Sequence, residues 1–371
     1  MEDFKGLHDL TLVIPAYNRS AYLQRQIDYW SSTDVRLCIL DGSVDSAPES
    51  LIAKMGPTVH YEHLPIGFNE RLVLASKIVK TKYVALLGDD ELYAKQGLVD
   101  CISQLESDER LIGCIGRSIF FFHRDGEIFA HQVYQKNQNL PDMFGDDLAR
   151  VRSSFPNGNP EGAPYLLYGV FRREAWGTMF GESYGRHYGS GYVYELALML
   201  IGAYLGPTAM VDSLTWFRSG ENPSMSSAAV IRKVGTGEWG TSPKYADEYQ
   251  DFVRRIVEVL EHYGKHSRDE IETTIRSVCE QFFAYSLHKP KRLIAYWHRT
   301  LYFFARHTPG FVKTLLKKNM TTKLGVVLDY KGVPFDDALE QLRSSGVSLD
   351  HIEMNATHDW LLKFHQRLLT S

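Results

Sequence analysis

The chain has 371 residues, of which 44% are hydrophobic and 23% charged, and its formal net charge is -4. This composition is typical of a soluble globular protein of one or two domains, and it argues against a dedicated nucleic-acid-binding protein. The four cysteines lack metal or redox spacing, the N-terminal segment lacks the apolar core of a secretory signal, and no apolar run reaches the length of a membrane span. We therefore expect a cytoplasmic protein.

Strand and helix patterns alternate along the first hundred residues. Apolar strand patterns occur at 10–17, 36–43, 59–64 and from 83 onward, with helical patterns between them. We expect Ser20 to be the N-cap of the first helix. This alternation predicts an α/β fold with a mainly parallel sheet and helices on both faces, in which ligands bind beyond the carboxyl ends of the strands.

Acidic side chains follow two of these strands. Asp41 ends the second strand, while Asp89, Asp90 and Glu91 end the strand that starts at Tyr83. Adjacent carboxylates repel one another, so such a group needs a positive partner, and a divalent cation that also binds phosphate oxygens suits it. A solvated acidic turn would explain the second group alone, but two acidic strand ends at one sheet edge favour a binding site. Neither GxGxxG nor GxxxxGKS/T occurs near these strands, which argues against dinucleotide oxidoreductases and P-loop enzymes.

The segments TLVIPAYNR, ILDGS and LLGDDE, in this order, resemble the nucleotide-binding half of the family 2 glycosyltransferases, which have the GT-A fold. The resemblance spans about residues 10–220. It implies that Pro15, Ala16 and Tyr17 border the nucleotide. It also implies that Asp41 accepts a hydrogen bond from the base and that Asp89 lies near the ribose.

The same resemblance assigns a divalent metal, Mn²⁺ or Mg²⁺, to Asp90. Glu91 stands where an aspartate is more common in the family, and we place it beside Asp90 as a second candidate ligand. Arg19 is the only basic residue just after the first strand and is a candidate for contact with the nucleotide sugar. Arg71 is another, because family members often carry a basic residue facing the nucleotide on this helix. An exposed arginine on an amphipathic helix is the alternative for Arg71.

The middle of the chain is expected to supply the acceptor side of the site. The segment YLLYGVFRRE resembles the strand that passes beneath the donor sugar in these enzymes, and Tyr168 and Gly169 would line the site there. The segment 213–227 resembles the one that closes over the diphosphate. Arg218 in this segment could offset the charge of the leaving group through a bidentate contact.

An inverting transferase needs a general base that removes the proton of the acceptor hydroxyl. Relatives usually carry an acidic pair where this chain has Tyr192 and Val193, and Glu195 is the nearest carboxylate. Partial burial would raise the pKa of Glu195 toward the working pH, as a base requires. A glutamate that pairs with an arginine to hold its helix is the alternative, and His187 is the reserve candidate for the base.

From about residue 241 the pattern becomes helical, so we divide the chain into a GT-A domain at 1–240 and a mostly α-helical C-terminal domain at 241–371. Within the first, the nucleotide-binding half is expected at about 10–117 and the acceptor half at about 118–240. Between 281 and 328, basic and aromatic residues are interleaved without any Asp or Glu. That composition suits contact with an anionic membrane surface, and it would also suit an RNA or an acidic polysaccharide. Packing of the aromatic residues on the catalytic domain is the alternative.

The resemblance implies a metal-dependent inverting glycosyltransferase that uses a nucleotide sugar, with a UDP-sugar favoured. The acceptor would be a hydroxyl of a glycan or lipid-linked glycan in surface polysaccharide or glycoconjugate biosynthesis, at the cytoplasmic face of the membrane. Two alternatives are a catalytically degenerate nucleotide-binding or scaffold protein of the same fold and a sugar-phosphate nucleotidylyltransferase. The latter would need a glycine-rich, basic stretch after the first strand, where only Arg19 is present.

Overall fold

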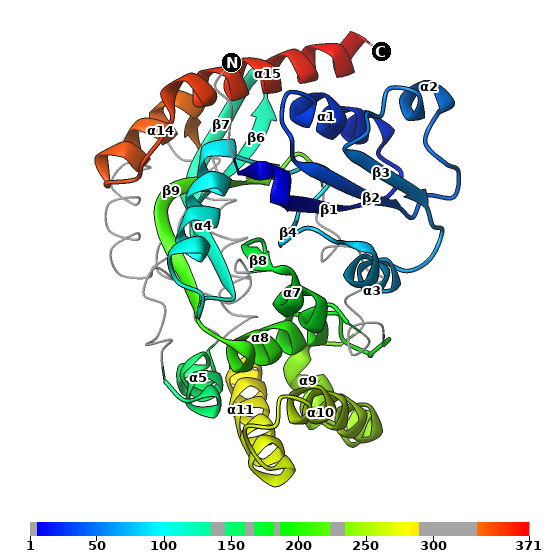
Figure 1. Ribbon diagram of the computed structural model, residues 1–371, viewed down its shortest axis with the longest axis vertical. Helices are drawn as coiled ribbons and strands as arrows, with labels where there is room; N and C mark the ends of the chain where they lie inside the picture. The colour runs from blue at the N-terminus through cyan, green and yellow to red at the C-terminus, as the bar shows by residue number, and fades with distance from the viewer. Residues whose placement is uncertain are drawn as a thin grey trace, which may run out of the picture.

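The computed structural model describes residues 6–134, 145–159, 167–181, 186–222, 234–288 and 332–370. A ten-stranded sheet crosses the molecule with the order β10-β7-β6-β8-β4-β1-β2-β3, and β9 joins it beside β5 and β6 (Figure 1). Helices pack on both faces of this sheet. The arrangement confirms the predicted α/β fold class.

The N-terminal half of the sheet is parallel and follows the predicted alternation. Its elements are β1 (Leu10–Ala16), α1 (Ser20–Trp30), β2 (Arg36–Asp41), α2 (Glu49–Ile52), β3 (Val59–His63), α3 (Phe68–Ile78) and β4 (Tyr83–Leu86). Because β2 and β4 flank β1, the carboxyl ends of these three strands meet at one edge of the sheet. The acidic residues after β2 and β4 are thereby brought to the same edge.

The other half of the sheet is mostly antiparallel, apart from the pair β6 and β9. It contains β5 (Leu92–Tyr93), α4 (Lys95–Ser107), β6 (Gly113–Arg124), β7 (Glu127–Val133), α5 (Asp147–Ser153), β8 (Val170–Arg172), α7 (Arg173–Met179), α8 (Val193–Leu205), β9 (Thr208–Ser219) and β10 (Val333–Pro334). β6 and β7 form a hairpin that turns on Asp125 and Gly126, whose φ angles are 54° and 84°. Two successive positive φ angles are typical of a tight hairpin turn. β8 pairs with β4 and β6 and joins the two halves.

Both faces of the parallel strands are buried. Leu12 of β1 belongs to one core, together with Leu23 of α1 and Leu98 of α4. The next residue, Val13, belongs to the opposite core, together with Leu72 of α3. A strand that is covered on both faces needs apolar residues at successive positions rather than at alternate ones, which explains the continuous apolar runs in the sequence.

The described region after residue 235 is mainly helical, as expected. It contains α9 (Thr236–Thr241), α10 (Ala246–Glu261), α11 (Arg268–His288), α14 (Phe335–Ser344) and α15 (His351–Thr370). α10 and α11 extend the core that contains α3 and α8, whereas α14 contacts β7 and α15 crosses the top of the view beside α1 (Figure 1). The helices therefore contribute to both cores, and the domain boundary near 240 stays a prediction.

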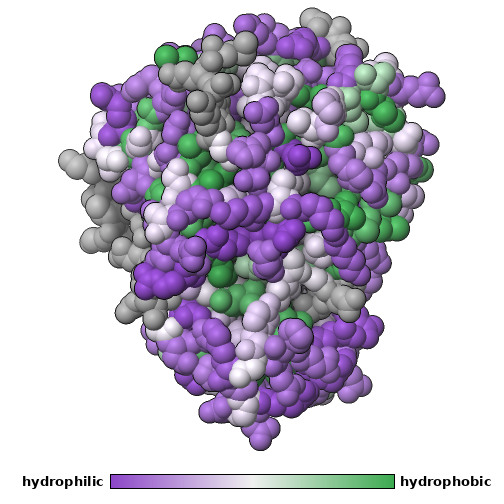
Figure 2. All heavy atoms as spheres, in the orientation of Figure 1, coloured by the Kyte–Doolittle hydropathy of each residue, from purple (hydrophilic) through white to green (hydrophobic). Residues whose placement is uncertain are grey.

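The surface and the cysteines relate to the expectations about membrane contact and disulfide bonds. Figure 2 shows the face of the molecule that is turned to the viewer in Figure 1. Hydrophilic side chains cover most of it, and apolar residues gather in small groups. Within the described ranges, no helix combines the length and the apolar character that crossing a membrane requires. All four cysteines are buried and free of disulfide bonds. Of the segment 281–328, residues 289–328 lie outside the described ranges, so its contact with a membrane stays a prediction.

Burial on both faces predicts that truncating either of two successive residues of β1 destabilises the protein. We expect Leu12→Ala to lower the free energy of unfolding by about 2 to 5 kcal/mol and Val13→Ala by about 2 kcal/mol, because each leaves a cavity in a different core. Val44→Ala is the control, since Val44 is 74% exposed. Urea denaturation of the three variants measures these changes. A Val13→Ala protein as stable as the Val44→Ala protein would contradict a sheet covered on both faces.

Candidate functional site

The carboxyl ends of β4, β1 and β2 form the edge on which the predicted nucleotide residues lie. Ala16 pairs with Asp41 in the parallel ladder between β1 and β2. Ala16 is buried, Pro15 is half-buried and Tyr17 is 51% exposed. Tyr17 is therefore the residue at the end of β1 whose aromatic ring is free to meet a planar ligand.

Asp41 is held in a fixed position by hydrogen bonds from two elements. Its side chain is buried and accepts hydrogen bonds from the amide of Ser43 at 3.0 Å, from the hydroxyl of Ser43, and from the hydroxyl of Tyr61 at 2.9 Å. The amide of Asn18, just after β1, donates to the Ser43 hydroxyl at 2.7 Å. The turn after β2 thus connects the ends of β1, β2 and β3 around one carboxylate.

Arg71 joins the ends of β1 and β2 from the side of α3. It is 2% exposed, and its Nη1 donates to the carbonyls of Ala16 and Leu40, each at 2.6 Å. Burial lowers the pKa of its guanidinium, and the charges of Asp41 and Asp89 oppose this change. The surface-arginine alternative is therefore wrong. The close approach also explains Gly42, because a Cβ atom there would lie 2.5 Å from Cζ of Arg71.

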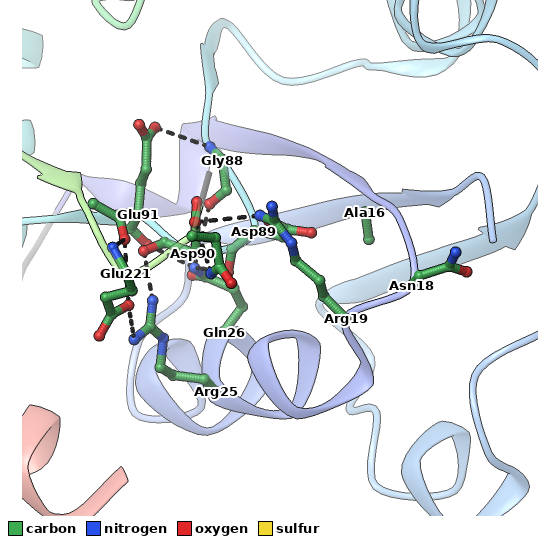
Figure 3. Close-up of polar contacts among 12 residues, drawn as sticks. Ala16, Asn18, Arg19, Arg25, Gln26, Gly88, Asp89, Asp90, Glu91 and Glu221 are labelled. Atoms are coloured by element: carbon green, nitrogen blue, oxygen red, sulfur yellow. Dashed lines mark hydrogen bonds and ion pairs between the residues drawn. The ribbon is translucent and has the colours of Figure 1, made fainter. Parts of the chain in front are cut away.

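The acidic group after β4 is balanced by Arg19. The Nη1 atom of Arg19 lies 2.7 Å from Oδ1 of Asp89 and 3.2 Å from Oδ2 of Asp90, and Figure 3 shows the guanidinium beside these carboxylates. Burial raises the pKa of Asp89 to about 6, although Arg19 lowers it. The expected N-cap role of Ser20 is wrong, since Arg19 occupies the N-cap position of α1 and its side chain forms no capping hydrogen bond.

Glu91 points away from Arg19 and into the protein. It is 8% exposed, and its Oε2 accepts hydrogen bonds from Nε1 of Trp216 at 3.1 Å and from the amide of Gly88 at 3.3 Å. Burial, followed by the charge of Asp90, raises the pKa of Glu91 to about 8. At neutral pH Glu91 is therefore mostly protonated, so the group does not carry three negative charges.

Two side chains of α1 that the sequence analysis missed support the acidic loop from below (Figure 3). Nε2 of Gln26 donates to the carbonyls of Asp89 at 3.0 Å and Glu91 at 2.7 Å. Nη2 of Arg25 donates to the carbonyl of Asp90 at 2.5 Å. Both residues are at most 1% exposed. Gln26 lies three positions after the buried Leu23 and four before the buried Trp30, and a polar residue on such an apolar stripe of a helix is the signal that could have identified it.

Asp90 is the carboxylate of this group that could hold a metal. Its side chain is 15% exposed, against 7% for Asp89, and its Oδ2 accepts a hydrogen bond from Nδ2 of Asn222 at 2.9 Å. Within the described ranges, no group of three or more His, Cys, Asp or Glu side chains is arranged to hold a metal ion. Mg²⁺ is commonly bound by one or two carboxylates together with substrate phosphates. The residues therefore fit a cation shared with a diphosphate, and Glu91 as a second ligand stays a prediction.

The predicted acceptor residues lie near Trp216 and Tyr134 or have their pKa altered by Arg218. The ring of Tyr168 stacks on Trp216 at 4.2 Å between centroids, and Nη1 of Arg218 donates to the hydroxyl of Tyr134 at 2.7 Å. Burial raises the pKa of Glu195 near the start of α8, and the charge of Arg218 opposes it. Arg218 is thus the arginine whose charge lowers the pKa of Glu195.

The remaining predicted residues lie at the margins of this region. Gly169 is buried directly before β8. His187 is exposed and lies beside Glu70 at the start of α3, with 3.4 Å between Nε2 and Oε1. The neighbouring Arg186 faces Asp251, with 3.8 Å between Nε and Oδ2. The charge of Arg218 thus lowers the pKa of Glu195, whereas His187 lies in a different environment beside Glu70.

No protein-family model matches the sequence, and no curated protein matches it. Among solved structures, the chain is similar to TarS 1–349 of S. aureus in complex with UDP-GlcNAc, with 11% identity over 84% of each chain and a TM-score of 0.45. It is also similar to the mannosyltransferase PcManGT from Pyrobaculum calidifontis in complex with GDP-Man and Mn²⁺. That match has 13% identity over 97% of this chain and 89% of the other, with a TM-score of 0.42. These similarities are distant.

The raised pKa of Glu91 predicts a defined pH dependence of stability. Its folded pKa of about 8 lies above the ordinary value of 4.5, so the native state binds this proton more tightly than the unfolded chain. The free energy of unfolding should therefore fall as pH rises from about 4.5 to about 8, by an amount on the order of a few kcal/mol.

Glu91→Gln removes this titrating group. The free energy of unfolding of the variant, relative to that of wild type, should therefore increase from pH 5 to pH 8.5. Urea denaturation at the two pH values, with EDTA present to exclude divalent ions, measures the difference. Glu109→Gln, at an exposed position, is the control. Equal pH dependence in wild type and Glu91→Gln would show that Glu91 is ionised throughout.

Proposed function

We propose that the chain is a glycosyltransferase with a GT-A fold that transfers a sugar from a nucleotide-sugar donor to a hydroxyl acceptor. The observation that carries this proposal is the meeting of Asp41, Asp89 and Asp90 at the carboxyl ends of adjacent parallel strands. Ligands of open α/β sheets bind at such an edge. The three sequence segments that resemble family 2 glycosyltransferases supply these same residues.

The edge offers one group for each part of a nucleoside diphosphate. The exposed ring of Tyr17 would contact the base, and the fixed carboxylate of Asp41 would accept from an imide N–H, which favours uridine. Asp89 would contact the ribose. Asp90 would hold a divalent cation, and that cation would neutralise charge on the departing diphosphate.

Glu195 is the proposed general base of an inverting displacement. The acceptor oxygen would attack the anomeric carbon as the bond from that carbon to the diphosphate oxygen breaks, and the hydroxyl proton would pass to Glu195. A base with a raised pKa suits this role near neutral pH, and burial raises the pKa of Glu195. Arg218 would offset the negative charge of the leaving group.

The nucleotidylyltransferase alternative has less support from the structure. Such an enzyme needs free basic groups after the first strand to hold a triphosphate, and Arg19 is instead bound to Asp89 and Asp90. We propose a glycan or a lipid-linked glycan as the acceptor and the cytoplasmic face of a membrane as the place of action. The segment 281–328 would provide the membrane contact.

The donor site can be tested by thermal stabilisation. We expect one of UDP, GDP, CDP and dTDP to raise the melting temperature by several degrees in the presence of Mn²⁺, because a ligand at 100 times its Kd stabilises the folded state by about 2.7 kcal/mol. Asp90→Asn should lose the Mn²⁺-dependent part of the shift. Asp269→Asn, at an exposed position in the first turn of α11, should retain it. No shift with any nucleotide would contradict the proposal and favour the scaffold alternative.

The base can be tested separately from binding. We expect Glu195→Gln to lower kcat about 100- to 10,000-fold, the usual effect of removing a general base, while the nucleotide shift in melting temperature stays unchanged. In wild type, kcat should fall as pH decreases through the raised pKa of Glu195, since only the carboxylate accepts the proton. His187→Gln is the matched variant and should retain turnover. Normal turnover in Glu195→Gln together with loss in His187→Gln would identify His187 as the base.

A further inference from the structure

A buried polar network connects the last helix of the chain to the acidic loop after β4. Nε2 of His365 in α15 contacts Oε1 of Glu221, just after β9, and Oε2 of Glu221 accepts a hydrogen bond from Nη1 of Arg25 at 2.7 Å. The side chains of Arg25 and Glu221 are 0% and 2% exposed, and that of His365 is 9% exposed. Figure 3 shows Arg25 reaching from α1 toward Glu221 and the loop.

Aromatic rings fix the two ends of this network. The guanidinium of Arg25 lies 4.6 Å from the ring centroids of both Tyr22 and Phe364, so α1 and α15 hold it between them. The ring of His365 stacks on His123 of β6 at 4.0 Å with an angle of 5°. The position of α15 therefore determines where the ring nitrogen of His365 meets Glu221.

The far side of the network ends on Asp90. Arg25 donates to the carbonyl of Asp90 at 2.5 Å, and Asn222, the neighbour of Glu221, donates to Oδ2 of Asp90 at 2.9 Å. The backbone and the carboxylate of Asp90 are thus both held by residues that Glu221 positions. A buried ion pair often stabilises a protein no more than apolar residues of similar volume would. Stability alone therefore does not explain the buried pair of Arg25 and Glu221.

We propose that His365 and Glu221 are positioning residues for Asp90, which makes α15 a part of the proposed metal and diphosphate site. This inference rests on the proposed function. His365 restrains Glu221, which restrains Arg25 directly and Asn222 through the chain, and these two orient Asp90. Residues that orient a metal ligand typically change metal affinity 10- to 100-fold when they are replaced.

A second contact of α15 provides the matched control. Glu353, near the start of α15, accepts hydrogen bonds from the amides of Lys95 at 2.5 Å and Gln96 at 3.1 Å, and so caps α4. Replacing it should loosen the packing of α15 without altering the His365 to Glu221 contact. Glu353→Gln therefore separates a general loss of stability from a specific effect on Asp90.

The experiment measures the Mn²⁺ concentration that gives half of the nucleotide-dependent shift in melting temperature. His365→Phe keeps an aromatic ring against His123 but removes the nitrogen, and we expect its half-saturating Mn²⁺ concentration to rise about tenfold or more. His365→Gln restores a side-chain donor and should recover most of the affinity. Glu353→Gln should melt at a lower temperature without ligand but keep the wild-type Mn²⁺ dependence.

The outcomes distinguish the inference from the function on which it rests. If wild type shows no Mn²⁺-dependent shift with any nucleotide, the proposed function is overturned and the inference with it. If wild type shows the shift but His365→Phe has the same Mn²⁺ dependence, or Glu353→Gln is as impaired as His365→Phe, only the inference is overturned. If His365→Phe does not fold, Asn222→Ala interrupts the same connection at its other end, and unchanged Mn²⁺ dependence there would also overturn it.

Discussion

One guanidinium nitrogen of Arg19 lies within ion-pair distance of both Asp89 and Asp90. The arrangement of the surrounding residues depends on balancing the negative charge of these two carboxylates. These carboxylates follow a strand with both faces buried, where water cannot hydrate them as it does at an open surface. The chain compensates with Arg19, and burial keeps the neighbouring Glu91 largely protonated. Gln26 holds the backbone of the loop through its carbonyls. An incoming diphosphate and its cation would therefore meet a group that is already partly neutralised.

The parallel half of the fold could be predicted from the sequence, because strands covered on both faces produce continuous apolar runs. The acidic strand ends could be predicted for the same reason, since Asp41 and Asp89 interrupt those runs abruptly. The orientation of a side chain carries no such signal. Glu91 is adjacent to Asp90, yet it faces Trp216, and the helical pattern around Arg71 does not distinguish an exposed arginine from one that binds two buried carbonyls.

The contacts that could not be predicted are those between distant segments. Arg25, Glu221 and His365 belong to α1, to the end of β9 and to α15, and no local spacing relates them.

The two sides of the proposed site also differ in the interactions that hold their side chains. Backbone and side-chain hydrogen bonds fix Asp41 and Asp89, whereas the environment of Glu195 is set mainly by burial and by the charge of Arg218.

The attachment of α15 also sets the order in which the protein can be completed during synthesis. His365 meets Glu221 across 144 positions of the chain, and Glu353 caps α4 across 258 positions. Contacts of such long range close late, since the entropy of a large loop must be overcome before they form. The parallel strands β1 to β4 end at residue 86 and emerge from the ribosome long before residue 365, so the proposed support of Asp90 is the later of the two to be completed. A nascent chain would thus hold its nucleotide edge before it could orient the residue proposed to bind the metal.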